Sequence, residues 1–295
     1  MVNINHMKKK AKGIIRRIFN CLNSLNLQRY YFECALVFMN TMLRSSILFA
    51  CATYYNLKES EIRQLERIEE EFLRELLKTG KGCPITQLYL EVGQTPARYE
   101  IIKTRLLYLK YILKQNQDSM LIKFFKIQMK SPSKGDWVSM CLDNLKELQI
   151  ESSFEDIEKM SCTQFKNILK EKAFRYLIEK QRSKGGEIEY TELKMSDYLL
   201  PNKESSIEEK IQVFSIRNKM DKNIPANFCS SQKIIICFCG NRENMEHVYN
   251  CKLLNEVEPS IKYEKIYSEN VKEIKAINER FQENMNSRQQ VINEI

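Results

Sequence analysis

The sequence predicts a mostly α-helical protein, and three observations lead to this prediction. Glycine and proline are scarce, at eight and six of 295 residues, and these are the residues that most often interrupt helices. Hydrophobic residues make up 43% of the chain and charged residues 29%, which is the balance of a globular protein. Several long stretches place apolar residues at i, i+3, i+4 and i+7, the period of a helix buried on one side.

Two helices are predicted near the N-terminus. Residues 14–25 place apolar side chains at helical spacing beside a basic face, the pattern of an amphipathic helix. Residues 28–53 are apolar around most of the circumference and predict a more buried helix. The most apolar stretch of the chain, residues 35–55, contains Asn40 and Arg44 and falls short of a clean span of about 20 apolar residues, so we expect no membrane segment.

A third helix is predicted to begin at Asn56 and Glu59, which have the spacing of a capping box. Gly80, Gly82 and Pro84 are expected to end it. Its favourable i,i+4 charge pairs are Glu59–Arg63 and Glu70–Arg74.

Within that helix, Glu69, Glu70 and Glu71 form an acidic run. Consecutive residues of a helix point in different directions. We therefore expect a solvated acidic surface there and no metal or acid–base site.

Further helices are predicted along the rest of the chain. Thr95 and Pro96 suit the start of a fourth helix, with Thr95 as its cap, that runs to about residue 114. A turn-rich joint follows at residues 131–137. Ser206 and Glu209 have the spacing of a capping box. The later helices are predicted over 138–148, 163–181 and 206–220, with a brief strand over 187–193.

Residues 233–251 have the ligand types and the spacing of a zinc site. Residues 233–238 predict a short strand, on which Cys237 and Cys239 face the same side. His247 and Cys251 are i and i+4 on a predicted short helix and share one face. These three sulfurs and one imidazole can hold one structural Zn²⁺ ion, with no position left for a catalytic water.

The zinc prediction has an alternative, since free cysteines are often simply buried in a core. His247 at helical spacing favours the metal, and Cys229 can substitute for one ligand. The chain has ten cysteines, most of them scattered, and we see no secretory signal. We therefore expect reduced thiols and an intracellular location, cytoplasmic or nuclear.

Basic residues cluster in two regions of a chain whose net charge is +9. Residues 1–30 contain seven basic residues and no acidic one, and a second set lines the predicted fourth helix and continues over residues 123–134. Such clusters are expected to neutralise the phosphates of RNA or DNA. A solubilising N-terminus is the alternative for the first cluster. The candidate nucleic-acid-binding residues are Lys8, Lys9, Lys10, Arg16, Arg17, Arg98, Lys103, Arg105, Lys110, Lys123 and Lys126.

Catalytic motifs are missing from the sequence. It contains no G-x-S-x-G, no P-loop and no H-E-x-x-H. Its six aspartates are scattered, whereas two-metal phosphoryl transfer requires clustered carboxylates. We assign no catalytic residue and expect no small-molecule substrate.

Several phrases of the sequence resemble the region just after the catalytic core in reverse transcriptases of non-LTR (LINE-type, jockey-like) retrotransposons. These phrases are residues 43–50, 62–70, 88–98, 108–113 and 134–137. The Cys-x-Cys…His…Cys stretch is similar to the zinc element near the C-terminus of those polyproteins. The resemblance spans roughly residues 10–255.

The resemblance implies a thumb-like helical region followed by a zinc-bearing tail, which in that family grip RNA template and target DNA. The family's fingers, palm and endonuclease are missing here, so no polymerase activity carries over. The metal-ligand pattern carries over to Cys237, Cys239, His247 and Cys251. The family's nucleic-acid contacts do not carry over to specific positions, so the basic residues rest on charge alone.

These observations predict four regions: a thumb-like helical region (1–130), a helical connector (131–222), a zinc element (223–256) and an amphipathic helical tail (257–295). The predicted function is nucleic-acid binding by the C-terminal part of a retrotransposon RNA-directed DNA polymerase, without catalysis of its own. Two alternatives stay open: a zinc-stabilised helical protein-interaction module, and a relic reading frame without a selected function.

Overall fold

The computed structural model describes residues 4–25, 27, 29–49, 51, 53, 57–80, 82–131, 133, 135–183, 190–201 and 205–217. The predicted zinc element, the predicted tail and the predicted cap Asn56 lie outside these residues. The chain divides into two compact units. Unit 1 comprises residues 1–27, 32–75 and 85–195, and unit 2 comprises residues 28–31, 76–84 and 196–295.

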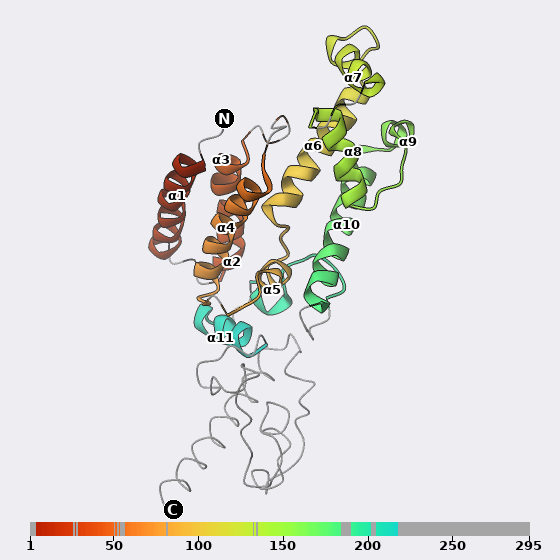
Figure 1. Cartoon of the computed structure of the whole chain (residues 1–295). Helices are drawn as coiled ribbons and strands as arrows, with labels where there is room; N and C mark the ends of the chain where they lie inside the picture. Colours follow the sequence, from red (N-terminus) through yellow and green to blue (C-terminus); the bar gives the residue numbers. More distant parts are fainter. Residues whose placement is uncertain are drawn as a thin grey trace, which may run out of the picture. The chain divides into compact units, whose positions relative to one another are not determined.

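The described part is mostly α-helical, as predicted (Figure 1). Its elements are α1 (Ile4–Ser24), α2 (Tyr31–Phe38), the π-helical η1 (Met39–Arg44), α3 (Ser45–Ile47), α4 (Glu59–Leu76), α5 (Ile85–Glu91), α6 (Ala97–Leu113), α7 (Met120–Lys130), α8 (Trp137–Glu147), α9 (Phe154–Lys159), α10 (Cys162–Arg182), the 3₁₀ turn η2 (Asp197–Leu199) and α11 (Ile207–Arg217).

Most helix ends follow the local chemistry of the sequence. Ser206 and Glu209 form the predicted capping box, with Ser206 N donating to Glu209 Oε2 at 3.0 Å and Glu209 N donating to Ser206 Oγ at 3.2 Å. The fourth predicted helix, α6, begins one residue later than expected, because Pro96 is its N-cap and Thr95 precedes the cap. The long helix predicted over 28–53 is shorter, and its continuation as η1 and α3 ends at Ile47.

Three helices were not predicted: α5, α7 and α9. The side chains of α5 are buried from Thr86 to Glu91, so this helix shows no polar face. The exposed residues of α7 include large apolar side chains among its lysines, which obscures its period. The strand expected over 187–193 is absent from its described part, residues 190–193, of which residues 191–193 form bends. Among the described residues, β pairing is limited to an isolated antiparallel bridge between Val92 and Met195.

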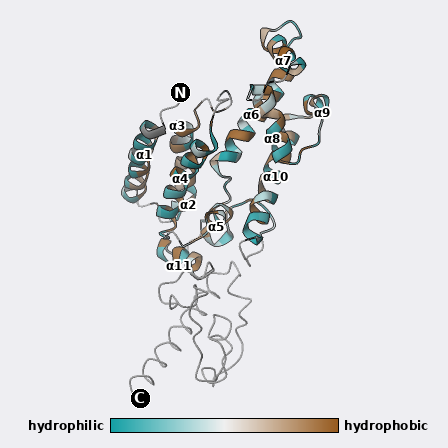
Figure 2. Ribbon diagram, viewed as in Figure 1, coloured by the Kyte–Doolittle hydropathy of each residue, from teal (hydrophilic) through white to brown (hydrophobic). Residues whose placement is uncertain are grey.

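Unit 1 has two groups of packed helices. In the first, α1 contacts η1 and α3, and the rings of Phe19 in α1 and Phe72 in α4 lie 5.3 Å apart. In the second, α6 contacts α7, α8, α9 and α10. The core of this second group includes Leu106, Leu109, Cys141, Leu145, Phe165 and Leu169. Figure 2 shows hydrophilic residues along much of α1 and hydrophobic residues on α7.

The described part of unit 2 centres on α11. The ammonium of Lys210 is buried and donates to the backbone carbonyl of Leu200 at 2.5 Å, which ties α11 to the end of η2. Within the part of the chain that the structure describes, no helix combines the length and the apolar character that a membrane crossing requires.

Candidate nucleic-acid interface

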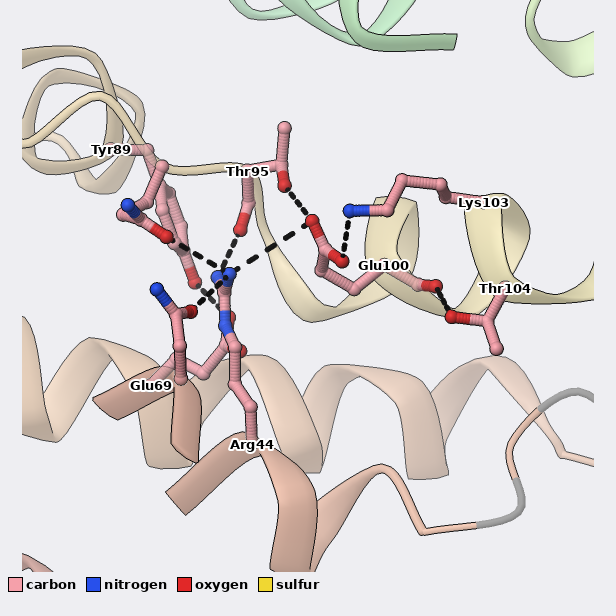
Figure 3. Close-up of polar contacts among 9 residues, drawn as sticks. Arg44, Glu69, Tyr89, Thr95, Glu100, Lys103 and Thr104 are labelled. Atoms are coloured by element: carbon pink, nitrogen blue, oxygen red, sulfur yellow. Dashed lines mark hydrogen bonds and ion pairs between the residues drawn. The ribbon is translucent and has the colours of Figure 1, made fainter. Parts of the chain in front are cut away.

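A buried polar network around Arg44 holds together the first half of unit 1 (Figure 3). Arg44 ends η1, and its Nε donates to Glu69 Oε1 of α4 at 2.8 Å. Its Nη1 donates to Gln94 Oε1 at 3.1 Å, and its Nη2 donates to the carbonyl of Thr95. Tyr89 of α5 donates its hydroxyl proton to Glu69 Oε2 at 3.0 Å. One arginine therefore links η1, α4, α5 and the turn before α6.

The expectation of a solvated surface at residues 69–71 is wrong for Glu69, whose exposed fraction is 0%. Glu71 is exposed, and Glu70 forms the predicted pair with Arg74 at 2.6 Å. The three side chains do point in different directions, as expected, but one direction leads into the protein. The buried carboxylate is tolerated because Arg44 and Tyr89 satisfy both of its oxygens.

Burial and pairing act in opposite senses on this network. Burial raises the pKa of Glu69, while the charge and hydrogen bond of Arg44 and the hydroxyl of Tyr89 oppose the rise, and the pKa stays above its ordinary value. Burial lowers the pKa of Arg44, but Glu69 and Glu100 raise it by more. The guanidinium therefore stays ionised at every accessible pH, and it is the fixed charge of the network.

Glu100 carries the network from the interior to the surface. Its Oε1 lies 3.9 Å from Arg44 Nη1 and accepts a hydrogen bond from Thr95 Oγ1 at 2.5 Å. Its Oε2 accepts a hydrogen bond from Lys103 Nζ at 2.6 Å. Figure 3 shows this order from Arg44 through Glu100 to Lys103. The ammonium of Lys103, one of the predicted nucleic-acid-binding residues, is therefore positioned by a chain of polar contacts that begins at Arg44.

Lys103 lines a groove of about 370 Å³ between α6 and α10. Two more lysines of the lining, Lys166 and Lys170, are i and i+4 on α10 and are both exposed. Glu100 is the single carboxylate among the described lining residues, and it is already bound to Lys103. The uncharged polar lining residues are Gln94, Thr95, Tyr99 and Asn167. The groove is therefore cationic, with additional hydrogen-bonding groups.

Gly93 shapes one end of this groove. Its φ is +65°, and a Cβ atom at this position would lie 2.2 Å from the backbone carbon of Lys194. The neighbouring Val92 pairs with Met195, and Leu193 lines the groove. Only glycine fits here, because the backbone is left-handed and a second backbone segment passes directly against it.

The structure separates the predicted nucleic-acid-binding residues into exposed and buried groups. On α1, Lys9, Lys10, Arg16 and Arg17 are exposed and Lys8 is half-buried; on α7, Lys123 and Lys126 are exposed. Arg98 is half-buried and lies within ion-pair distance of three carboxylates, those of Glu59, Glu66 and Glu147. Its charge is therefore compensated inside unit 1.

Arg105 and Lys110 point into the protein, and we correct their assignment. Arg105 is 4% exposed and donates to Asn144 Oδ1 at 2.7 Å. Lys110 is 1% exposed and donates to the carbonyls of Ile157 and Met160, the latter at 2.5 Å. Because α6 packs against four other helices, most directions around it lead to protein and not to solvent.

The cations of α10 were missed by the sequence analysis. This helix carries six basic residues and two acidic ones. The predicted helix over 163–181 already contained the signal, since Lys166 and Lys170 are one turn apart on its sequence. The sequence did not show which helix packs against α10. Only the contact of α10 with α6 places Lys103 beside Lys166 and Lys170 in one groove.

The predicted zinc ligands lie outside the described residues. Within the described residues, no group of three or more histidine, cysteine, aspartate or glutamate side chains is arranged to hold a metal ion. Cys51, Cys83 and Cys141 are buried cysteines. Burial raises the pKa of Cys141 to about 12, so this thiol is protonated and unreactive at neutral pH.

Comparison of the chain with protein-family models, with curated proteins and with solved structures finds no significant match.

Proposed function

We propose that this chain binds nucleic acid through cationic surfaces of unit 1, as the thumb-like C-terminal part of a LINE-type reverse transcriptase without catalytic activity of its own. The observation that supports this best is the α6–α10 groove, in which Lys166 and Lys170 are exposed beside Lys103. Ammonium groups arranged along a groove are suited to successive phosphates of one strand.

The distribution of charge among the helices also supports the proposal. α1 carries six basic residues and no acidic one, and α7 carries three basic residues and no acidic one. α4 has the opposite balance, with seven acidic and three basic residues. Two of the α4 carboxylates are paired with arginines of unit 1: the buried Glu69 with Arg44, and the exposed Glu59 with Arg98. Some of the carboxylates are thus neutralised by arginines of unit 1, while many of the lysines stay exposed at its surface.

The resemblance supports the proposal in a second way. Arg44, Glu69, and Tyr89 with Thr95 come from three of the phrases that resemble the retrotransposon family, and they meet in one polar network. We expect the segments that resemble the family to depend on one another when their side chains form a single polar network. The proposed structural zinc at Cys237, Cys239, His247 and Cys251, the choice between RNA and DNA, and a cytoplasmic or nuclear location belong to the same proposal.

The proposal is tested by the salt dependence of binding. The double variant Lys166→Glu/Lys170→Glu is compared with wild type on a labelled duplex and a labelled single strand. If both lysines contact phosphates, the negative slope of log K (the association constant) against log[salt] is less steep in the variant than in wild type, by about 0.9 per lost contact on duplex DNA.

The matched control is Lys146→Glu/Lys159→Glu. Both of these lysines are exposed, and they lie on α8 and α9. This double variant changes the net charge by the same amount and is expected to leave the slope unchanged. Equal slopes in wild type and in the groove variant would remove the groove from the interface, and no binding of either probe by wild type would refute the proposed function.

A protein-interaction module is the second candidate, because α7 exposes apolar side chains. Met120 is 68% exposed and Ile127 is 62% exposed. Nuclease treatment separates the two functions: a protein partner held directly stays bound in a pull-down, whereas one bridged by nucleic acid is lost.

A further inference from the structure

Three aromatic rings lie together where α6 approaches α7 and α8. The rings of Tyr108 and Tyr111, one helical turn apart on α6, are stacked with centroids 5.9 Å apart and an interplanar angle of 14°. The ring of Trp137, the first residue of α8, meets Tyr108 edge-on, with centroids 5.7 Å apart. Tyr108 is therefore held from two sides, and Tyr111 rests on a ring that is itself fixed.

Tyr111 is the outermost of the three rings and is 54% exposed, whereas Tyr108 and Trp137 are half-buried. Covering a large exposed aromatic side chain with a partner is favourable, because it removes apolar surface from water. A ring already in a parallel stack is well suited to receive one more flat ring on its open face.

The segment that follows Tyr111 is rich in basic residues, with Asp118 as its one acidic residue before α8 apart from Asp136. Lys114 lies one helical turn beyond Tyr111 and is exposed. α7, which contacts α6, adds the exposed Lys123, Lys126 and Lys130 and contains no acidic residue. A flat partner that also carries negative charge therefore matches this surface, and a nucleotide has both properties.

The position of Tyr111 on α6 connects it to the groove. Lys103 and Tyr111 are eight residues apart on one helix, which corresponds to about 12 Å along its axis. A single strand with its phosphates on the groove lysines can thus continue along α6 and present a base to Tyr111. A duplex cannot do the same without unpairing, because its bases are already stacked on one another.

We propose that Tyr111, supported by Tyr108 and Trp137, is a stacking platform for an unpaired base, so that this face of α6 binds single-stranded nucleic acid. The inference rests on the proposed function and adds to it a preference for unpaired strands. It also assigns the preference to one ring, not to the overall charge.

The test compares three fluorescent probes of equal length: a single-stranded oligothymidine, a duplex, and a single strand of abasic sites that keeps the phosphates but lacks the bases. In Tyr111→Ala, the affinity for oligothymidine falls by about 5- to 100-fold, the range for loss of one base–aromatic stack. The affinities for the duplex and for the abasic strand stay at their wild-type values. Tyr111→Trp retains oligothymidine binding, because it keeps a ring at this position.

The matched control is Phe49→Ala, which removes an aromatic ring that is 74% exposed elsewhere in unit 1, and it leaves all three affinities unchanged. Thermal unfolding of each variant shows that the fold is retained. If Tyr111→Ala binds oligothymidine as wild type does, or loses the abasic strand to the same extent, the stacking platform is refuted while the proposed function stands. Photo-crosslinking from position 111 to a protein and not to the strand also refutes it. If wild type binds none of the probes, the proposed function itself fails.

Discussion

Arg44 and Glu69 form a buried ion pair, with 2.8 Å between Nε and Oε1, across 25 residues of sequence. The pair connects η1 to α4, and through Glu100 it extends to Lys103 at the edge of the α6–α10 groove. The stability of unit 1 and the placement of a candidate phosphate-binding lysine therefore depend on the same interaction.

Removing one partner of this pair is expected to be costly. Glu69→Ala leaves the Arg44 guanidinium buried without its main counter-charge, and we expect the free energy of unfolding to fall by about 3–5 kcal/mol. The double variant Arg44→Met/Glu69→Leu removes both charges, so its loss should be clearly smaller than the sum of the two single losses. Urea unfolding followed by circular dichroism measures both effects.

Glu71→Ala is the control for this experiment, since Glu71 is the exposed member of the same acidic run. Its effect should stay within about 0.5 kcal/mol. If Glu69→Ala were as mild as Glu71→Ala, the pair would not be a determinant of stability.

Gly93 is expected to tolerate no side chain. Gly93→Ala forces a left-handed residue to carry a Cβ atom that collides with the backbone of Lys194. We expect a loss of about 2–4 kcal/mol from backbone strain and overpacking together, measured by thermal unfolding. Gly13→Ala is the matched control: a Cβ there meets no atom within 4 Å, and because Gly13 lies inside α1 the substitution should stabilise by about 0.5–1 kcal/mol. Equal melting temperatures for the two variants would contradict the assignment.

Because of Glu100, the unfolding free energy of unit 1 should change with pH in the acidic range. Burial raises the pKa of its carboxyl, but Arg44, Lys103 and Thr95 lower it by more, so the pKa lies below its ordinary value of 4.5. A carboxylate with a lowered folded-state pKa contributes stability above its unfolded pKa, and the contribution is lost as the pH falls through the folded pKa. The difference in unfolding free energy between wild type and Glu100→Gln should therefore shrink as the pH falls below 4.5. A difference that does not change with pH would contradict this.

Lys110 should matter for stability and not for binding. Its ammonium donates to the carbonyls of Ile157, Glu158 and Met160 around the end of α9. Lys110→Met leaves buried carbonyl groups without their donor, and we expect a loss of about 1–3 kcal/mol with unchanged affinity for nucleic acid. Lys146→Met, at an exposed position of α8, should change stability by no more than about 0.5 kcal/mol. If the folded Lys110→Met variant bound nucleic acid more weakly than wild type, Lys110 would have to be counted among the binding residues again.

The zinc prediction is tested by metal analysis of the purified chain, which should contain about one zinc ion per molecule. His247→Ala should release this metal, because it removes one of four predicted ligands. Cys229→Ser serves as the comparison, since Cys229 is the reserve ligand, and it should keep the metal if Cys237, Cys239 and Cys251 complete the site. A metal-free wild-type protein that is nevertheless folded would refute the zinc site.

Much of the helical structure was predictable because its causes are local. The pairs Glu59–Arg63 and Glu70–Arg74 form as their spacing indicates, at 3.3 and 2.6 Å. The capping box of Ser206 with Glu209 also forms as its spacing indicates. The short helices α5 and α9 were missed because seven or six residues offer too few turns for a hydrophobic period to be recognised.

The candidate site was predictable only in part, and the reason is the direction of each side chain. Charge alone identified Lys103, Lys123 and Arg17, which the structure keeps accessible, and equally Lys110, which it buries. The same reasoning placed Glu69 in solvent, where the structure makes it the buried partner of Arg44. A charge count carries no information about which side of a helix a distant segment will cover.

The sequence by itself determined the mostly helical fold, many of the helix ends and the basic character of α1, because these depend on residues within one or two turns of each other. Tertiary structure decided which charged side chains are paired or buried inside unit 1 and which stay exposed to solvent. It paired Arg44 with Glu69, closed α10 against α6 to place Lys166 and Lys170 beside Lys103, and left Tyr111 exposed on the ring of Tyr108. The physical reason is that desolvation acts on each side chain through whatever packs against it, and those neighbours are mostly distant in sequence.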